Sequence, residues 1–365
     1  MIYATPPLNS EQEARLEELD ALRRELSREA EGPLRWLGPL RRSVRASSIE
    51  SSTSIEGYSV APEEAIALVR DPGLADPHKE SQLAVACYAR AMDRVGVLAI
   101  DPAFHWVDRI ILDLHFDICY FQRDKNPGLW RTGPIGVTAR DGSLEFQGPD
   151  ANAVPGLMAE VVAWLEDGDL DAHCVVRAAM AHLHVTSVHP FRDGNGRVSR
   201  VVQSLVLARE GMVAPEFTSI EEYLGEHTPA YYAALRAVQD GGYRPERDAS
   251  SWVAFCIDAH IAQAHRRLAQ IRDAAARWER LETLVEARDW PERLAIALEQ
   301  SLFGDTDRAR YRDEADISMP TASADFRRLL DAGLVEQTGR GRSTRYRASE
   351  LLRAEVASEP FGSEQ

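Results

Sequence analysis

The sequence predicts a mainly α-helical fold, interrupted by one small β-hairpin and followed by a separate C-terminal unit. Apolar residues recur at helical spacing through most of the 365 residues. The stretch at about 128–147 instead shows the glycine, turn and alternating residues of a hairpin. The length exceeds that of one typical domain, and an apolar content of 44% supports sizeable cores, so two or three units are expected.

The predicted elements divide the chain into four regions. The long amphipathic helical patterns lie at 11–29, 81–95 and 250–284. The regions are an N-terminal helical part at 1–100, a core at 101–284, a second unit at 285–350 and a tail at 351–365. The helical pattern at 250–284, a long helix or a pair of helices, ends before Asp289-Trp-Pro291, so a linker or boundary is expected near 285–292.

A serine-rich segment at about 47–57 ends in Ser52-Thr-Ser-Ile-Glu56-Gly57. Ser52 and Glu56 are four residues apart and share a helical face, and Gly57 can end a helix. This arrangement places a carboxylate at a helix end. The simpler alternative is a capped turn with an ordinary surface glutamate.

The predicted hairpin starts after Gly128-Leu-Trp-Arg-Thr132 and turns at Asp141-Gly142. An exposed hairpin edge can align a target segment by adding it as a strand, through backbone hydrogen bonds. The alternative is a structural hairpin that covers hydrophobic surface.

Residues 189–200 read His-Pro-Phe-Arg-Asp-Gly-Asn-Gly-Arg-Val-Ser-Arg. A histidine can accept a proton, a carboxylate can hold Mg²⁺, and arginines can neutralise phosphate. Apolar spacing predicts a helix from about Gly196 to Glu210. The free amides and the positive dipole end at its N-terminus would form an anion site, which the glycines leave accessible.

This stretch resembles, without a mismatch, the HxFx(D/E)GNGRxxR motif of the Fic family, and residues 172–182 resemble the helix that leads into it. The resemblance implies a Fic-type helical bundle that transfers AMP from ATP to a Ser, Thr or Tyr hydroxyl of a target protein or of the chain itself. It also implies Mg²⁺ as cofactor, with Mn²⁺ as an alternative.

The resemblance implies roles for individual residues. His189 is expected to be the general base and Asp193 the metal ligand. The expected nucleotide-binding residues are Arg192, Gly194, Asn195, Gly196, Arg197 and Arg200. The hairpin would be a flap that docks the target through Thr132, Ile135 and Val137.

Ser52, Glu56 and Gly57 resemble the (S/T)xxxE(G/N) inhibitory motif of the same family, in its N-terminal-inhibition class. The resemblance implies that Glu56 forms an ion pair with Arg200 and so prevents the ATP γ-phosphate from binding this arginine. The chain would then be an autoinhibited enzyme.

Other activities stay open at this stage. Gly196 disfavours a kinase-like relative, in which lysine replaces this glycine. Other nucleotide or phosphocholine donors, and removal of AMP with Glu56 orienting water, fit the same motif. A different class of function is a DNA-binding regulator whose Fic core senses nucleotide, but a purely binding module would not need His189.

The region after residue 292 resembles a winged helix-turn-helix domain. Its expected helices are 293–302, 305–316 and 321–332, and its expected strands are 334–338 and 343–347. Residues 338–347 contain four arginines and no acid, which favours phosphate contact. On the expected recognition helix, the negative charges of Asp325 and Asp331 counteract the positive charges of Arg327 and Arg328. DNA binding and protein docking are therefore equally well supported as the role of this unit.

A net charge of −16 argues against a nonspecific nucleic-acid coat. No apolar stretch is long enough to span a membrane and the N-terminus lacks an export signal, so a cytoplasmic protein without membrane contact is expected.

The four cysteines lack metal-binding spacing and are expected to be reduced, buried thiols. A homodimer stays open.

Overall fold

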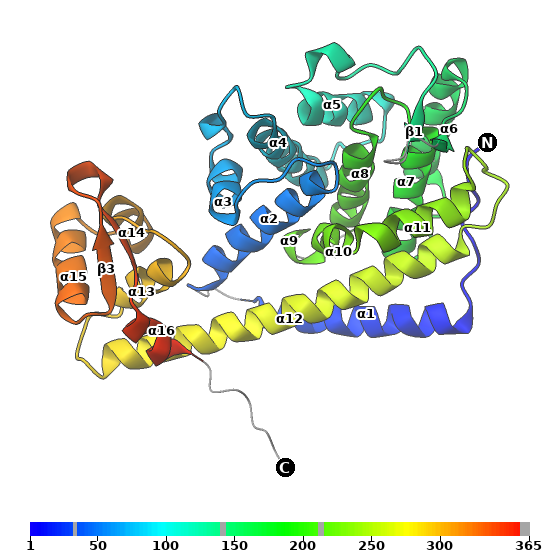
Figure 1. Ribbon diagram of the computed structural model, residues 1–365. Helices are drawn as coiled ribbons and strands as arrows, with labels where there is room; N and C mark the ends of the chain where they lie inside the picture. Colours follow the sequence, from blue (N-terminus) through cyan, green and yellow to red (C-terminus); the bar gives the residue numbers. More distant parts are fainter. Residues whose placement is uncertain (32–34, 139–143, 211–214, 358–365) are drawn as a thin grey trace. The chain divides into compact units, whose positions relative to one another are not determined.

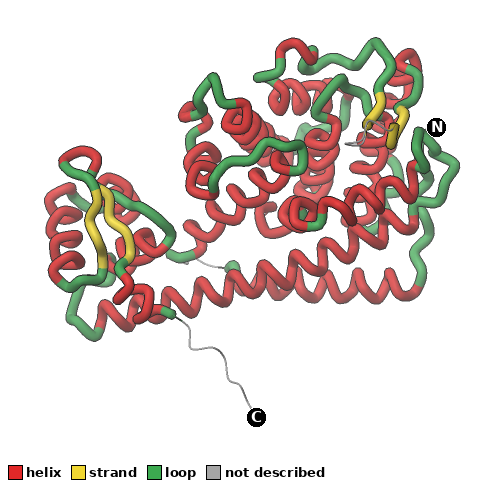
Figure 2. Tube along the Cα trace, viewed as in Figure 1, coloured by secondary structure: helices red, strands yellow, loops and turns green. Residues whose placement is uncertain are grey.

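The computed structural model describes residues 1–31, 35–138, 144–210 and 215–357. Helices dominate the described chain, and the strands form only two small antiparallel pairs (Figures 1 and 2). The predicted mainly α-helical fold with a small hairpin is therefore confirmed.

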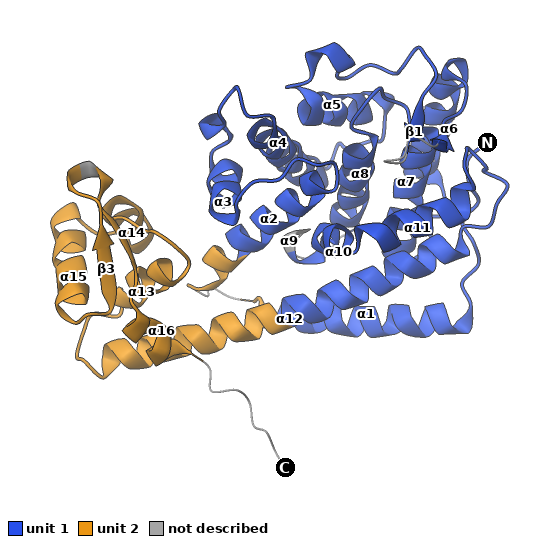
Figure 3. Cartoon of the chain, in the orientation of Figure 1, with its two compact units in different colours: residues 1–28, 41–268 blue, residues 29–40, 269–365 orange. Residues whose placement is uncertain are grey.

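The chain forms two compact units (Figure 3). The first contains residues 1–28 and 41–268, and the second contains residues 29–40 and 269–365. Helices α2 and α12 both contribute to the two units, and the last residue of α1, Glu29, belongs to the second. The four predicted regions remain a prediction about domain limits.

The first unit is a helical bundle around α7 and α8, which pack against each other. Its helices are α1 (Ser10–Glu29), α2 (Leu37–Ser54), α3 (Pro62–Arg70), α4 (Glu80–Ile100), α5 (Asp108–Cys119), α6 (Val154–Asp167), α7 (Cys174–Val188), α8 (Asn195–Arg209), α9 (Pro215–Thr218), α10 (Glu221–Glu226), α11 (Thr228–Gln239) and the start of α12 (Ser250–Glu286). Helices α4 and α5 also pack on α8. Every residue of α7 from Val175 to Val188 is buried, which makes this helix a rigid support for the residues that follow it.

The hairpin consists of β1 (Gly136–Thr138) and β2 (Leu144–Gln147), paired antiparallel with Val137 opposite Phe146. The predicted Asp141-Gly142 turn lies outside the described residues. On its other side, β2 is held by residues 241 and 242, because the Gln147 amide donates a 3.0 Å hydrogen bond to the Gly241 carbonyl. Among the described residues β1 pairs only with β2, so its second edge is open.

The second unit contains the C-terminal half of α12 and a set of shorter elements. These are α13 (Leu294–Leu302), α14 (Arg308–Ala315), α15 (Met319–Asp331), β3 (Val335–Thr338), β4 (Arg345–Ala348) and α16 (Glu350–Val356). The order of three helices and an antiparallel strand pair agrees with the predicted elements. The winged-helix interpretation itself stays a prediction.

Two further expectations concern membranes and thiols. Among the described residues, no helix combines the length and apolar character needed to span a membrane. All four cysteines are free thiols; Cys87, Cys119 and Cys256 are buried and Cys174 is partly exposed.

Candidate active site

The motif loop connects the end of α7 to the start of α8. His189 follows α7 with a left-handed backbone (φ +50°), which is uncommon for a residue with a side chain. Gly194 precedes α8 with φ +76°, and a Cβ there would overlap Cys119 Sγ. Glycine is therefore needed at 194 both for its conformation and for its close packing against α5.

Asn195 holds the loop in this conformation. Its Oδ1 accepts a hydrogen bond from the Phe191 amide and its Nδ2 donates one to the Phe191 carbonyl, both at 2.9 Å. Phe191 is fully buried and stacks on His115, with ring centroids 3.6 Å apart. Asn195 therefore positions the loop here, and its predicted contact with the α-phosphate is untested.

The imidazole of His189 is arranged to accept a proton. Its Nδ1 lies 3.0 Å from the Thr186 carbonyl oxygen. A carbonyl only accepts, so the hydrogen is on Nδ1 and the lone pair is on Nε2. Burial lowers the pKa of His189 below its ordinary value, although the hydrogen bond to Thr186 and the charge of Glu56 oppose this shift. The ring is therefore neutral near pH 7.

Asp193 and Arg197 lie together at the start of α8. The Arg197 side chain is fully buried and its Nη2 lies 3.4 Å from Asp193 Oδ1. Two other nitrogens of this guanidinium, Nε and Nη1, are buried without a hydrogen-bond partner among the described residues. Because buried donors are normally satisfied, these nitrogens mark a place where an anion is expected.

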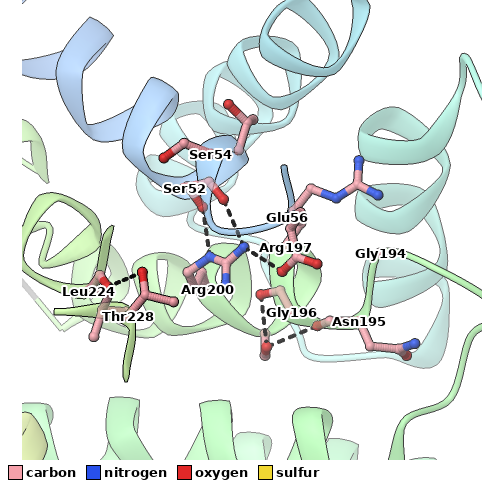
Figure 4. A network of polar contacts seen from close by, with 12 residues as sticks. Ser52, Ser54, Glu56, Gly194, Asn195, Gly196, Arg197, Arg200, Leu224 and Thr228 are labelled. Atoms are coloured by element: carbon pink, nitrogen blue, oxygen red, sulfur yellow. Dashed lines mark hydrogen bonds and ion pairs between the residues drawn. The ribbon is translucent and has the colours of Figure 1, made fainter. Parts of the chain in front are cut away.

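Arg200 is held by the end of α2 (Figure 4). Its Nε donates to Ser52 Oγ at 2.7 Å, and its Nη2 donates to the Ser52 carbonyl at 2.9 Å and to Glu56 Oε1 at 3.0 Å. Arg200 is 1% exposed. Burial alone would lower its pKa, but the charge of Glu56, the hydroxyls of Tyr231 and Tyr88 and the hydrogen bond to Glu56 together raise it.

Glu56 reaches this position because α2 ends in a left-handed turn. The Gly57 amide donates to the Ser54 carbonyl at 2.9 Å and the Tyr58 amide to the Thr53 carbonyl at 3.1 Å, with Gly57 at φ +88°. This is the Schellman ending of a helix, in which glycine avoids the strain of a positive φ. Glu56 is the last residue before the reversal, and its carboxylate lies over Gly196 in the first turn of α8.

Comparison with known proteins agrees with this geometry. Residues 106–207 match the model of the Fic/DOC family. The chain carries a Fic domain. "Protein adenylyltransferase fic-1" of Caenorhabditis elegans is 36% identical over 92 residues, which cover 24% of this chain and 16% of that protein. A "probable protein adenylyltransferase" of Aquifex aeolicus is 30% identical over 97 residues, covering 27% of this chain and 28% of that protein. The chain thus spans under a third of the length of either relative.

Solved structures share the fold of the Fic domain. Fic-1 (residues 134–508) from C. elegans aligns with a TM-score of 0.56 and 20% identity, over 72% of this chain and 73% of that chain. A Fic-domain-containing signaling protein from Bacteroides thetaiotaomicron aligns with a TM-score of 0.55 and 17% identity, over 71% of this chain and 97% of that chain.

The Fic domain of this chain has further site residues that sequence reasoning missed. His115 Nδ1 accepts a 2.8 Å hydrogen bond from the Gly128 amide, so its Nε2 carries the hydrogen and donates to the Asp193 carbonyl at 3.1 Å. Burial lowers the pKa of His115 to about 4. A neutral His115 therefore joins the segment before the hairpin to the motif loop.

Arg131 joins the hairpin to the same loop. Its Nε donates to the His189 carbonyl at 2.8 Å and its backbone amide donates to the Pro190 carbonyl at 2.9 Å. Its Nη1 and Nη2 donate to the carbonyls of Gly133 (2.8 Å) and Pro149 (2.6 Å), on either side of the strand pair. In the sequence, the segment Gly128-Leu-Trp-Arg131 indicated only that a hairpin follows, and nothing in it pointed to the hydrogen-bond partners of Arg131.

The structure brings most of the predicted site residues together. His189, Asp193, Gly194, Asn195, Gly196, Arg197 and Arg200 surround the start of α8, and Ser52 and Glu56 meet Arg200. Arg192 is exposed beside them. In the hairpin segment, Thr132 and Val137 are exposed and Ile135 is half-buried.

Proposed function

We propose that this protein is an adenylyltransferase that moves AMP from ATP to a Ser, Thr or Tyr hydroxyl of a target protein and of itself. The observation that carries the proposal is the tautomer and position of His189, with its Nε2 lone pair available beside the start of α8. The relatives that are named protein adenylyltransferases support it.

In the proposed reaction, His189 Nε2 takes the proton of the acceptor hydroxyl as the oxygen attacks the α-phosphorus of ATP. The bond from that phosphorus to the oxygen that bridges it to the β-phosphate breaks, and diphosphate leaves. The amides at Gly194–Gly196 and the guanidiniums of Arg197 and Arg200 would hold the phosphates, with exposed Arg192 at the rim.

The donor set of the site fits Mg²⁺. Asp193 offers a carboxylate whose side chain is 34% exposed. Among the described residues, no cluster of three or more His, Cys, Asp or Glu side chains could hold a metal ion by itself. Mg²⁺ requires few protein ligands because phosphate oxygens and water complete its octahedron. When bound through Asp193, the ion would neutralise charge on the leaving diphosphate.

The open edge of β1 supports target docking by strand addition. Strand β2 is held by the hydrogen bond from Gln147 to Gly241 and by an ion pair between Glu145 and Arg236 at 3.5 Å, while β1 has an exposed second edge. A target segment beside Val137 would gain backbone hydrogen bonds with little demand on its sequence. Arg131 would keep that segment in register with His189.

The proposed resting state is autoinhibited. Ser52 and Glu56 bind Nε and Nη2 of Arg200, and Nη1 is buried without a hydrogen-bond partner among the described residues, so a γ-phosphate would have to displace Glu56 to bind Nη2. The carboxylate also lies over Gly196, where the phosphate-binding amides are expected.

Labelled nucleotides test the proposal directly. Purified protein and its Glu56→Gly variant would be incubated with Mg²⁺ and ATP labelled at the α- or the γ-phosphate, alone and with a cell lysate. Retention of α-label only, with an intact mass increased by AMP, supports adenylyl transfer. Retention of γ-label, or preference for another nucleotide or a phosphocholine donor, would contradict it.

A second function, DNA binding through the second unit, is favoured by the burial of Asp325. This carboxylate accepts hydrogen bonds from Arg293 Nε (2.8 Å) and Tyr311 Oη (2.9 Å) and is 3% exposed. Of the two acids on α15, therefore, only the exposed Asp331 can offset the exposed Arg327 and Arg328. We infer that this face, with the exposed Arg340, contacts the DNA backbone. A gel shift of the full chain with duplex DNA at low and physiological salt tests this inference.

A further inference from the structure

Tyr58 connects the inhibitory segment to a second part of the nucleotide site. It follows Gly57, and its ring lies edge-on to Phe121 with centroids 5.7 Å apart. The Arg197 guanidinium lies 5.2 Å from the centroid of the Tyr58 ring, within the range of a cation–π contact. Burial raises the pKa of Tyr58, so its hydroxyl is uncharged.

The hydroxyl of Tyr58 accepts a 3.0 Å hydrogen bond from Gln122 Nε2. The same nitrogen donates to Asp193 Oδ2 at 3.0 Å, and Gln122 Oε1 accepts from Arg197 Nη2 at 3.2 Å. The orientation of this amide is fixed by its partners, because a guanidinium only donates and a carboxylate only accepts. The two hydrogens of Nε2 are therefore shared between Tyr58 and Asp193.

Gln122 thus lies between the inhibitory segment and two residues that the reaction needs. Asp193 has both carboxylate oxygens engaged, since Oδ1 also accepts a 2.6 Å hydrogen bond from the Gly194 amide. Arg197 faces Gln122 and Tyr58 with one nitrogen bonded, while two buried donors lack a partner among the described residues. These contacts are separate from the hydrogen bonds that Arg200 donates to Ser52 and Glu56.

We propose that Tyr58 is a second inhibitory residue, which acts through Gln122 to hold Asp193 and Arg197 in an arrangement unfavourable for Mg²⁺–ATP. The proposal rests on the proposed function and adds to the contact between Glu56 and Arg200. When Tyr58 withdraws, Gln122 loses a partner that fixes its side chain, and the carboxylate of Asp193 can turn toward a cation. One hydrogen bond is worth about 0.5–1.5 kcal/mol, which corresponds to roughly 2- to 10-fold in affinity.

The test is calorimetric titration of the full chain with ATP, once with Mg²⁺ and once with a chelator. The variant is Tyr58→Phe, which removes the hydroxyl and keeps the ring against Phe121 and Arg197. The matched control is Tyr120→Phe, because the exposed Tyr120 hydroxyl also accepts one hydrogen bond, from Arg123 Nη2 at 2.9 Å. We expect Tyr58→Phe to bind Mg²⁺–ATP roughly 2- to 10-fold more tightly than wild type. Neither Tyr58→Phe with the chelator nor Tyr120→Phe should show this gain.

Gln122→Met separates this route from a general effect on stability. With the amide removed, adding Tyr58→Phe should change Mg²⁺–ATP affinity no further. An equal gain with Mg²⁺ and with the chelator, no gain at all, or a full gain in the Gln122→Met background would each overturn the proposal. Failure of every variant to bind ATP would instead overturn the proposed function, and this inference with it.

Discussion

The carboxylate of Glu56 lies over Gly196 so closely that any side chain at position 196 would overlap it. Arg200 holds that carboxylate at 3.0 Å from the neighbouring turn of α8. The proposed inhibition therefore depends on two positions of α8, one that binds the carboxylate and one that leaves room for it.

Glu56→Gly should raise autolabelling strongly. Holding a two-state site about 99% closed takes only about 2.7 kcal/mol, so removal of one ion pair can yield roughly a 100-fold gain. Initial rates at saturating Mg²⁺–ATP measure this gain, with the exposed Glu63→Gly as a control for loss of a carboxylate. The double variant Glu56→Gly/Arg200→Ala should lose the gain. Equal rates for Glu56→Gly and wild type would mean that the contact does not inhibit.

His189→Ala should abolish transfer and leave nucleotide binding intact. Loss of a general base costs about 10²- to 10⁴-fold, whereas Arg197, Arg200 and the loop amides remain. Labelling and ATP titration in the Glu56→Gly background separate the two effects, with exposed His78→Ala as the control. Near-normal labelling without the imidazole would remove His189 from the mechanism.

The acid limb of the rate profile should lie below pH 6.5. The base acts when neutral, and burial lowers the pKa of His189, so protonation begins only at more acidic pH than for a free histidine. Glu56→Gly removes a charge that raises this pKa and should move the limb further down. Rates between pH 4.5 and 8 for this variant provide the check, and a limb above 6.5 would contradict it.

Folding stability should fall as pH drops from about 6.5 toward 4. Burial lowers the pKa of His182 and His184 to about 3 and that of His115 to about 4. The unfolded chain takes up protons at these residues below about 6.5 while the folded chain does not, so acid favours unfolding by up to about 1.4 kcal/mol per pH unit for each histidine. Urea midpoints at pH 7.5 and 5 measure this loss, and equal midpoints would argue against neutral buried histidines.

Charge reversal on the second unit should affect DNA binding and not autolabelling. Arg327→Glu with Arg340→Glu removes exposed positive charge from α15 and from the segment after β3, so affinity for duplex DNA and its dependence on salt should both decrease. Arg345 and Arg347 are paired with Asp307 at 3.6 Å and Glu336 at 3.0 Å and are left unchanged. Exposed Arg353→Glu in α16 is the control. An unchanged gel shift would leave protein docking as the role of this surface.

Sequence predicted the parts of this molecule that depend on local spacing. The helices on either side of His189 follow from apolar periodicity, and the motif residues lie close together in the chain. His115, Gln122 and Tyr58 were missed because the contacts that join them to one another or to Asp193 span more than 60 residues and no local pattern marks them. Asp325 was expected to oppose Arg327 and Arg328 on the recognition helix, yet it follows Ala322 by three residues and lies on the buried side with Phe326 and Leu329. Its partner Arg293 is remote in sequence, so only the fold shows why a carboxylate can be buried there.

The ending of α2 places Glu56 between two opposed helix ends. Its own helix presents carbonyl oxygens there, which repel a carboxylate, whereas the start of α8 presents amide hydrogens, which attract it. A phosphate bound at the N-terminus of α8 would occupy the position beside these amide hydrogens. The Glu56 carboxylate would then face only the carbonyl oxygens at the end of α2, which repel it. ATP would then do more than compete for Arg200, because its arrival makes the closed position of Glu56 electrostatically unfavourable from both sides.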